Sequence, residues 1–359
     1  MQRRTLRIEL PAVVLAQIPR NARCVTGLTG VRTCGSTGLP EGAQAWVESI
    51  EASPVLDCET LAGGAGRRRY WRLRLGTART LILMWARNED PAILPPALRD
   101  QNAGEAFAEL TEIFGGAGIP VPELHAFERG RSWLLLEDLG GCHLLDLDGP
   151  EQTAARDAAI DLLARFHQLE LPPEARPCRR AFDREWVLFE LQLFADRTQQ
   201  RSRVLQNALD QLALAIEALG RCVCMRDFQS HNLMLDAHGR LRVIDYQDAL
   251  MAPPELDLAA LLFDSYVPYS SGERERLRSR YERATGHRIA DDALALLTLQ
   301  RKCKDASRFH LLVTEQADSR FEAAFERAQQ AAGQALEQLT ATRPAIAEPI
   351  RQALEALSL

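Results

Sequence analysis

One short stretch in the second half of the chain constrains the fold most. Two apolar runs, Leu233–Leu235 and Leu241–Ile244, flank the turn sequence Asp-Ala-His-Gly, and this pattern predicts a β-hairpin. Asp227 and Asn232 come before the first run, and Asp245 directly follows the second. We therefore expect one amide and two carboxylate side chains at the same end of the hairpin.

Such a set of side chains suits phosphoryl transfer from a nucleotide. Mg²⁺, which prefers oxygen ligands, must be held on the phosphates. A separate carboxylate receives the proton of the acceptor hydroxyl. A single Asp before a strand is more often a turn or cap residue. The order and spacing of the three residues together favour a kinase-like site.

The spacing of these residues resembles the catalytic core of the protein-kinase-like phosphotransferases. Arg226 and Asp227 are followed by Asn232, and Asp245 comes thirteen residues after the Asn. The sequence Asp257-Leu-Ala, preceded by Pro-Pro, narrows the resemblance to the aminoglycoside phosphotransferase and choline kinase-like family. The resemblance implies that Asp227 is the catalytic base, that Asn232 and Asp245 hold Mg²⁺, and that ATP is the phosphoryl donor. It also implies that Arg226 and Asp257 support the catalytic loop.

The same resemblance implies an α+β, bilobal protein-kinase-like fold. Residues 41–138 would form a nucleotide-binding N-lobe, an antiparallel sheet plus a helix. Residues 139–359 would form a mostly helical C-lobe with catalytic and acceptor-binding roles. Residues 1–40 carry six arginines against the single acid Glu9 and show no packing pattern. We expect them to be a poorly ordered basic extension rather than a functional arm or a secretory signal.

A glycine-rich turn precedes a predicted strand in the N-lobe. Glycines let backbone amides approach phosphates closely, although the same pattern also fits an ordinary hairpin turn. The family covers its nucleotide at this position and binds adenine through backbone groups of the segment between the lobes, here Leu134–Gly140. The implied nucleotide contacts are Gly63, Gly64, Gly66, Arg69, Leu136 and Asp138.

The strand that should carry the phosphate-binding lysine of the family carries Met84 instead. The chain has two lysines, Lys302 and Lys304, and both lie in the predicted C-lobe. Without that lysine, neither Glu105 nor Glu109 of the following predicted helix has a defined role. Arginines near the glycine turn and the strand are the candidates to replace the lysine: Arg68, Arg69, Arg72 and Arg87.

Four local features are similar to bacterial kinases that phosphorylate the anomeric hydroxyl of N-acetylmuramate and N-acetylglucosamine. They are Arg-Arg-Tyr-Trp-Arg from Arg68, the Met at 84, Asp-Tyr-Gln-Asp-Ala from Asp245, and the helical segment that begins at Gln300. Three positions depart from that pattern: Gly66, Met225 and Ser307.

N-acetylmuramate carries a lactyl carboxylate, which favours an Arg or Lys in the acceptor pocket. Arg301 and Lys304 lie on the helix that the family places near the acceptor, although solvated surface charges would give the same pattern. The candidate substrate contacts are Gln247, Asp248, Arg301 and Lys304.

The resulting hypothesis is an ATP-dependent sugar kinase that phosphorylates the anomeric (C1) hydroxyl of N-acetylmuramate, N-acetylglucosamine or both, in peptidoglycan recycling. One alternative is an aminoglycoside or other small-alcohol O-phosphotransferase, whose polycationic substrate would need an acidic pocket; Asp264, Asp291 and Asp292 keep it open. A second alternative is a catalytically weak, nucleotide-binding pseudokinase, suggested by Met84 and Met225.

Composition limits the partners and the compartment. No apolar run approaches the roughly 20 residues that span a bilayer, and a net charge of −6 argues against a nucleic-acid binder. We expect a cytoplasmic enzyme with a small-molecule substrate and no obligate protein partner. The eight cysteines lack paired CxxC spacing, so reduced cysteines are favoured over a zinc site, including at Cys222-x-Cys224.

Overall fold

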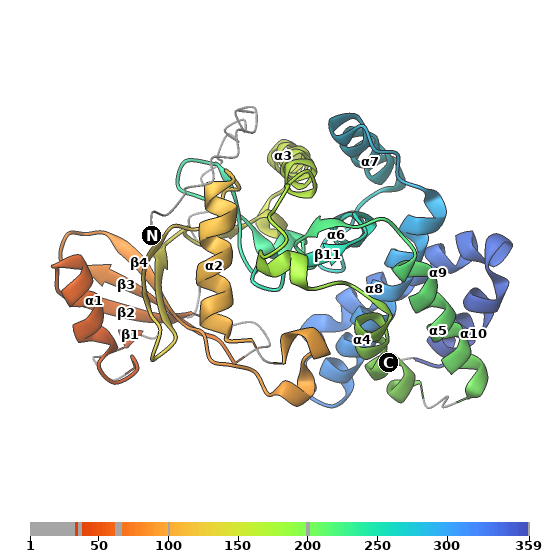
Figure 1. Ribbon diagram of the computed structural model, residues 1–359, viewed down its shortest axis with the longest axis horizontal. Helices are drawn as coiled ribbons and strands as arrows, with labels where there is room; N and C mark the ends of the chain where they lie inside the picture. Colours follow the sequence, from red (N-terminus) through yellow and green to blue (C-terminus); the bar gives the residue numbers. More distant parts are fainter. Residues whose placement is uncertain (1–32, 35–37, 62–66, 100, 199–201, 358–359) are drawn as a thin grey trace. The chain divides into compact units, whose positions relative to one another are not determined.

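The computed structural model describes residues 33–34, 38–61, 67–99, 101–198 and 202–357. The chain forms two compact units, coloured along the sequence in Figure 1. The first unit contains the described residues up to Leu94 together with Leu98–Ala155 and Leu233–Gln247. The second contains Pro95–Ala97, Arg156–Asn232 and the described residues from Asp248 onward. The predicted division at residue 138 is a single boundary, whereas these units exchange segments several times.

The first unit combines strands with a few helices. Its strands are β1 (Thr33–Cys34), β2 (Val55–Leu61), β3 (Arg69–Leu75), β4 (Thr80–Trp85), β5 (Leu124–Glu128), β6 (Trp133–Glu137), β7 (Cys142–His143), β9 (Leu233–Leu235) and β10 (Leu241–Val243). Its α-helices are α1 (Ala43–Glu51) and α2 (Ala103–Gly116), and short 3₁₀ turns lie at η2 (Pro91–Ile93) and η4 (Leu144–Asp146). The turn η3 (Pro96–Leu98) and the helix α3 (Gly149–His167) each contain residues of both units.

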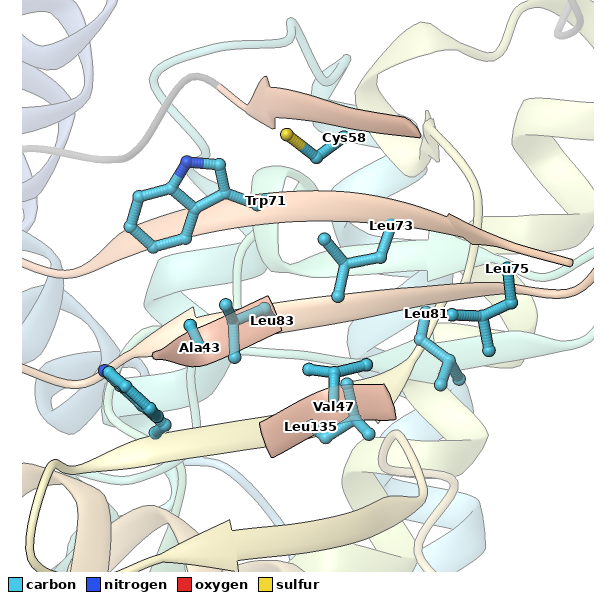
Figure 2. Packing of buried hydrophobic residues seen from close by; sticks show 10 residues of the cluster. Ala43, Val47, Cys58, Trp71, Leu73, Leu75, Leu81, Leu83 and Leu135 are labelled. Carbon is cyan, nitrogen blue, oxygen red and sulfur yellow. The ribbon is translucent and has the colours of Figure 1, made fainter. Parts of the chain in front are cut away.

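The main sheet of this unit is antiparallel, with the strand order β1-β2-β3-β4-β6-β5. Alternate residues of β3 point to opposite faces, so Trp71 and Leu73 enter the core while Tyr70 and Arg72 face the other way. Figure 2 shows the core side, where Ala43 and Val47 of α1 pack against these strands. Burying each large apolar side chain stabilises such a core by about 1.5–3 kcal/mol.

A smaller sheet has the order β10-β9-β7 and contains the predicted hairpin. Leu233 pairs with Val243, and Leu235 pairs with Leu241. Gly239 has a φ of 71°, which suits the turn between the two strands because glycine has no Cβ to clash there. The amide of Val243 also donates to the carbonyl of Pro120 at 3.0 Å, which attaches the hairpin to the first unit.

The second unit is mostly helical. After α3 it contains η5 (Arg176–Arg179), α4 (Arg184–Arg197), α5 (Arg203–Glu217), β8 (Cys222–Cys224), η6 (Ser230–Asn232), β11 (Leu250–Ala252), α6 (Glu255–Leu262), α7 (Ser271–Thr285), α8 (Asp291–Thr314), η7 (Ser319–Phe321), α9 (Glu322–Thr342) and α10 (Pro344–Glu355). Helix α8 packs against α4, α6 and α9, and its residues 293–303 are buried. A core helix therefore carries Arg301.

The α+β fold class is confirmed, the expected hairpin forms, and the second unit is mostly helical. Most of residues 1–40 and the glycines at 63, 64 and 66 lie outside the described residues. The cysteines at 58, 178, 222, 224 and 303 are reduced as expected, but Cys142 is in a disulfide, so the expectation of fully reduced cysteines is wrong there. In the part of the chain that the structure describes, no helix has the length and apolar character needed to cross a membrane.

Candidate active site

The predicted catalytic loop begins where β8 ends. Strand β8 pairs antiparallel with β11, and the next amide, that of Met225, donates to Oδ2 of Asp257 at 2.6 Å. Asp257 is fully buried on α6. Its role as the support of the catalytic loop remains a prediction. Arg226 has a φ of 81°, an unfavourable conformation for a residue with a Cβ. Strain of this kind persists where the surroundings enforce it, often at functional sites.

Hydrogen bonds within the loop fix the backbone of Asp227. Its carbonyl oxygen accepts from the amide of Gln229 and from Nδ2 of Asn232, both at 2.9 Å. The amide of Asn232 in turn donates to the carbonyl of Gln229 at 2.9 Å. Because Nδ2 of Asn232 is used in this way, Oδ1 is the atom of the amide that can face a cation.

The Asp227 carboxylate lies among cations. Nη2 of Arg301 donates to its Oδ1 at 3.1 Å, and Nε of Arg226 lies 3.9 Å from Oδ2. Burial alone would raise the pKa of Asp227, but Arg226, Lys304 and Arg301 outweigh this effect and hold the pKa well below its usual range. Asp227 is therefore ionised at neutral pH.

Glu190 on α4 is a buried acid that the sequence reasoning did not select. It accepts from Arg226 at 3.0 Å and from Nε2 of Gln300 at 2.9 Å, and Nζ of Lys304 lies 3.4 Å away. Burial would raise its pKa, yet Lys304 and Arg226 lower the pKa of Glu190 to about 2. An acid within the apolar run from Trp186 to Phe194 was the available signal for a buried, paired carboxylate.

Asp264 also binds this loop. Its Oδ2 accepts from both the amide and the hydroxyl of Ser230, at 2.7 and 2.6 Å. Asp291 pairs with Arg278, and Asp292 accepts from Arg343 at 2.7 Å. The three acids that could have lined a pocket for a polycation all bind groups of this chain.

In the first unit, Asp245 follows β10 with a φ of 62°, again in the left-handed region. Its Oδ1 accepts from Nη1 of Arg68 at 2.7 Å and from Nε2 of Gln247 at 3.1 Å. These bonds leave Oδ2 of Asp245 as the oxygen that faces neither donor. Gln247, a candidate substrate contact, thus lies beside the predicted metal ligand.

The neighbouring Tyr246 anchors this segment. Its hydroxyl forms a 2.6 Å hydrogen bond with Thr111 on α2, and its ring contacts Phe107 and Phe114 at centroid distances of 5.0 and 5.8 Å. Burial in this apolar setting raises the pKa of Tyr246. The tyrosine therefore acts as a packing residue that fixes the backbone on which Asp245 is carried.

The predicted adenine-binding segment contains a polar connection to β3. Nε of Arg72 donates to Oδ2 of Asp138 at 2.8 Å, and its Nη2 donates to the carbonyl of Gly140 at 2.9 Å. Leu136 is a residue of β6, where it pairs with Ile82 of β4 and with Leu124 of β5. Asp138, the other predicted nucleotide contact of this segment, follows the end of β6. These two nucleotide-contact assignments remain predictions.

The arginines that could replace the missing lysine have different partners in the structure. Met84 is fully buried and pairs with Tyr70, so its position supplies no charge. Arg72 is committed to Asp138, and Arg87 lies over the ring of Trp85 at 4.9 Å. Arg68 approaches Asp245 and also hydrogen bonds to Tyr70, while Arg69 begins β3 as an exposed residue. Arg68 is the candidate that lies next to a predicted metal ligand.

The other substrate candidates are charged groups with partners in the second unit. Arg301 is 3% exposed, and Nη1 and Nη2 donate to the Arg226 carbonyl, Asp227 and Gln229. Asp248 lies 3.5 Å from Nη1 of Arg226, and Lys304 pairs with Glu190. Arg301 is thus a partner of the predicted base rather than a solvated surface charge.

The donor chemistry of the predicted metal ligands suits Mg²⁺. Asn232 and Asp245 each retain an oxygen beyond the hydrogen bonds described above, and Mg²⁺ prefers oxygen ligands. The hairpin register pairs Leu233 with Val243, so Asn232 enters the hairpin at the end from which the chain leaves toward Asp245. The residues present fit the ion.

Comparisons with known proteins identify the family. The model of the phosphotransferase enzyme family (APH) matches residues 57–297, more than half of the chain. The N-acetylmuramate/N-acetylglucosamine kinase of Neisseria meningitidis serogroup B is 26% identical over 235 residues, which cover 62% of this chain and 66% of that protein. The Pseudomonas aeruginosa protein of the same name is 29% identical over 256 residues, covering 68% and 70%.

A solved structure supports the fold. The choline kinase LicA from Streptococcus pneumoniae superposes with a TM-score of 0.58 at 18% sequence identity. The superposition covers 82% of this chain and 98% of that one. At this identity the likeness concerns the fold alone.

Proposed function

Because this chain belongs to the phosphotransferase enzyme family and is a phosphotransferase acting on a hydroxyl group, we propose that it transfers the γ-phosphoryl group of ATP to an amino sugar. The proposed acceptor is the anomeric hydroxyl of N-acetylmuramate, N-acetylglucosamine or both, as part of peptidoglycan recycling. The observation that carries this proposal is the name shared by the relatives in Neisseria and Pseudomonas, at 26% and 29% identity. The Arg-Arg-Tyr-Trp-Arg segment from Arg68 and the Met at 84 point the same way.

Asp227 is proposed to orient the acceptor hydroxyl and to receive its proton late in the reaction. Its cationic neighbours lower the pKa of its carboxyl group, so it is a weak base that accepts a hydrogen bond readily and a full proton reluctantly. The anomeric hydroxyl of a sugar is more acidic than the other ring hydroxyls. A weak, well-fixed base is therefore sufficient for this acceptor.

Asn232 and Asp245 are proposed to hold Mg²⁺ on the nucleotide phosphates. The ion, when bound, neutralises charge that develops on the phosphoryl oxygens. Arg68 would leave Asp245 to bind a phosphate oxygen in place of the family lysine, because a guanidinium binds either kind of anion through the same donors. Arg226 and Asp257 would keep the loop that carries Asp227 in place.

Two alternatives receive less support. An aminoglycoside kinase would need free acids for a polycation, but Asp264, Asp291 and Asp292 bind groups of the chain itself. A pseudokinase is favoured by the uncharged Met84, yet Arg68 offers a cation close to that strand, and the predicted base and both predicted metal ligands are present in the sequence.

The test is release of ADP with a panel of acceptors: N-acetylmuramate, N-acetylglucosamine, choline and kanamycin. We expect turnover with one or both amino sugars and loss of turnover when the C1 hydroxyl is replaced by a methoxy group. Turnover with choline or kanamycin alone would contradict the proposal, and binding of ATP without turnover of any acceptor would favour the pseudokinase.

The Asp227→Asn variant tests the assigned base. We expect kcat to fall by about 10²–10⁴-fold, while the Kd for ATP stays within a few fold of the wild-type value. Asp210→Asn is a matched control, because Asp210 pairs with Arg184 at the exposed start of α4 and touches none of the loop. A near-native rate in Asp227→Asn would show that the base is misassigned.

A further inference from the structure

A buried cluster of sulfur and nitrogen lies at the start of the catalytic loop, apart from the groups assigned above. It contains His167 at the end of α3 and both cysteines of β8, Cys222 and Cys224. Their potential ligand atoms all lie within 4.8 Å of one another. Cys222 and Cys224 are two residues apart in a strand, so both side chains project from the same face.

The distances in the cluster match the edges of a metal coordination tetrahedron. Zn–S and Zn–N bonds of about 2.3 and 2.05 Å place two sulfur ligands about 3.8 Å apart, and sulfur and nitrogen about 3.6 Å apart. The Sγ atoms of Cys222 and Cys224 are 3.7 Å apart, and Sγ of Cys224 is 3.7 Å from Nε2 of His167. Oδ2 of Asp257 lies 3.3 Å from the same nitrogen and is a neighbour of the cluster rather than a member of it.

The cluster has more lone pairs than hydrogens to satisfy them. Sγ of Cys224 lies near the carbonyl oxygens of Ala252 and Pro253, at 3.4 and 3.5 Å, as well as near Cys222 and His167. One thiol hydrogen serves one of these neighbours. Among the described residues, Oδ1 of Asp257 is also buried with no hydrogen-bond donor. A cation at this point would compensate the excess of acceptors.

The surroundings orient the histidine as a ligand. Nδ1 of His167 lies 2.7 Å from the hydroxyl of Tyr281, which can accept a hydrogen bond from Nδ1 when Nε2 binds a metal. Ligating histidines in proteins usually donate their other ring N–H in this way.

We propose that His167, Cys222 and Cys224 bind one Zn²⁺ ion. The ion links α3 to β8 and supports the backbone just before Arg226 and Asp227. The chemistry of the site is independent of which acceptor the enzyme phosphorylates.

The first experiment measures zinc in the full-length protein. After incubation with Zn²⁺ and exhaustive dialysis, we expect about one zinc ion per chain in the wild type and less than a tenth of that in the Cys222→Ser/Cys224→Ser double variant. Cys178→Ser is the matched control, since Cys178 is a free cysteine of the same unit outside the cluster. Equal zinc contents in the wild type and the double variant would overturn the proposal.

Two measurements on the wild type remain decisive even if the double variant fails to fold. Substitution with Co²⁺ should give the visible bands of a tetrahedral ion and a thiolate-to-cobalt charge-transfer band. Alkylation followed by peptide mass spectrometry should show that Zn²⁺ protects Cys222 and Cys224 but leaves the reactivity of Cys178 unchanged. Octahedral cobalt spectra, equal alkylation with and without zinc, or a disulfide between Cys222 and Cys224 in the freshly purified protein would each overturn the site.

Discussion

Arg301 has two possible roles, recognition of the substrate and positioning of the base. The two roles predict different activities for an Arg301 variant. A role in binding the lactyl carboxylate predicts that the Arg301→Met variant loses activity with N-acetylmuramate and keeps it with N-acetylglucosamine. The structure instead places both Nη atoms on the catalytic loop, at Asp227, Gln229 and the carbonyl of Arg226. We therefore expect kcat to fall about 10- to 100-fold with both sugars, because the base loses its orientation.

The control for this comparison is Arg308→Met, an exposed arginine on the same helix, which should keep wild-type kinetics with both sugars. Steady-state kcat and KM for each sugar provide the measurement. A rise in KM confined to N-acetylmuramate would return Arg301 to the acceptor pocket.

We expect Arg68 to bind the nucleotide phosphates in place of the missing strand lysine. The Arg68→Ala variant should raise the KM for ATP by about 10- to 100-fold, the value of one charge-assisted contact, and Arg68→Lys should recover most of the loss. Arg74→Ala is the control, because Arg74 lies on β3 with about half of its side chain exposed and pairs with Asp57 at 3.5 Å. An unchanged KM for ATP in Arg68→Ala would assign the phosphate contact to another residue.

The hairpin β9–β10 depends on one buried arginine. Arg242 on β10 donates to Glu137 and Asp236 and, at 2.7 Å, to the carbonyl of Val121. Arg242→Ala removes a buried cation from two carboxylates and a carbonyl, so we expect the free energy of unfolding to fall by about 3–5 kcal/mol. Arg240→Ala removes a half-exposed arginine that pairs with the same Asp236, and it should cost less than about 1 kcal/mol.

Denaturant unfolding of the two arginine variants beside the wild type measures this difference. Similar losses in both variants would mean that the shared acceptor Asp236, rather than burial of Arg242, determines the stability of the hairpin.

Most elements could be predicted from the sequence because their signals are local. Apolar runs and turn residues indicate the hairpin. Asn102 caps α2 by accepting a 3.0 Å hydrogen bond from the amide of Glu105, which is a local interaction too. The partner of a buried charge is not a local property. Glu190 meets Gln300 across 110 positions of sequence, and no spacing rule relates the two.

At the scale of the whole chain, the predicted boundary at residue 138 comes from the resemblance, which places a hinge there. The two compact units are instead defined by which segments of the chain contact each other. The hairpin comes late in the sequence but joins the first unit, since Val243 bonds to Pro120 and Tyr246 packs under α2. The predicted base Asp227 and the segment of Asp245 therefore belong to different units. The position of the hairpin in the sequence does not predict that it belongs to the first unit.

Acid should destabilise the second unit through its buried carboxylates, and Glu190 allows the effect to be measured. Its pKa is about 2 in the folded chain against 4.5 for the ordinary side chain, because Lys304 and Arg226 outweigh the effect of burial. The folded state binds the proton less readily than the unfolded state does. The stability that Glu190 contributes is thus complete above about pH 4.5 and is lost as the pH falls toward 2.

Glu190→Gln removes this titration. We expect it to lower the free energy of unfolding at neutral pH by on the order of 3 kcal/mol, and the gap between variant and wild type should shrink as the pH falls, since the wild type loses the same interaction by protonation. Glu185→Gln, an exposed position on the same helix, should differ from the wild type by a small amount that is constant with pH. Urea unfolding across this range gives the measurement, and a gap for Glu190→Gln that stays constant with pH would mean that its pKa is not lowered in the folded chain.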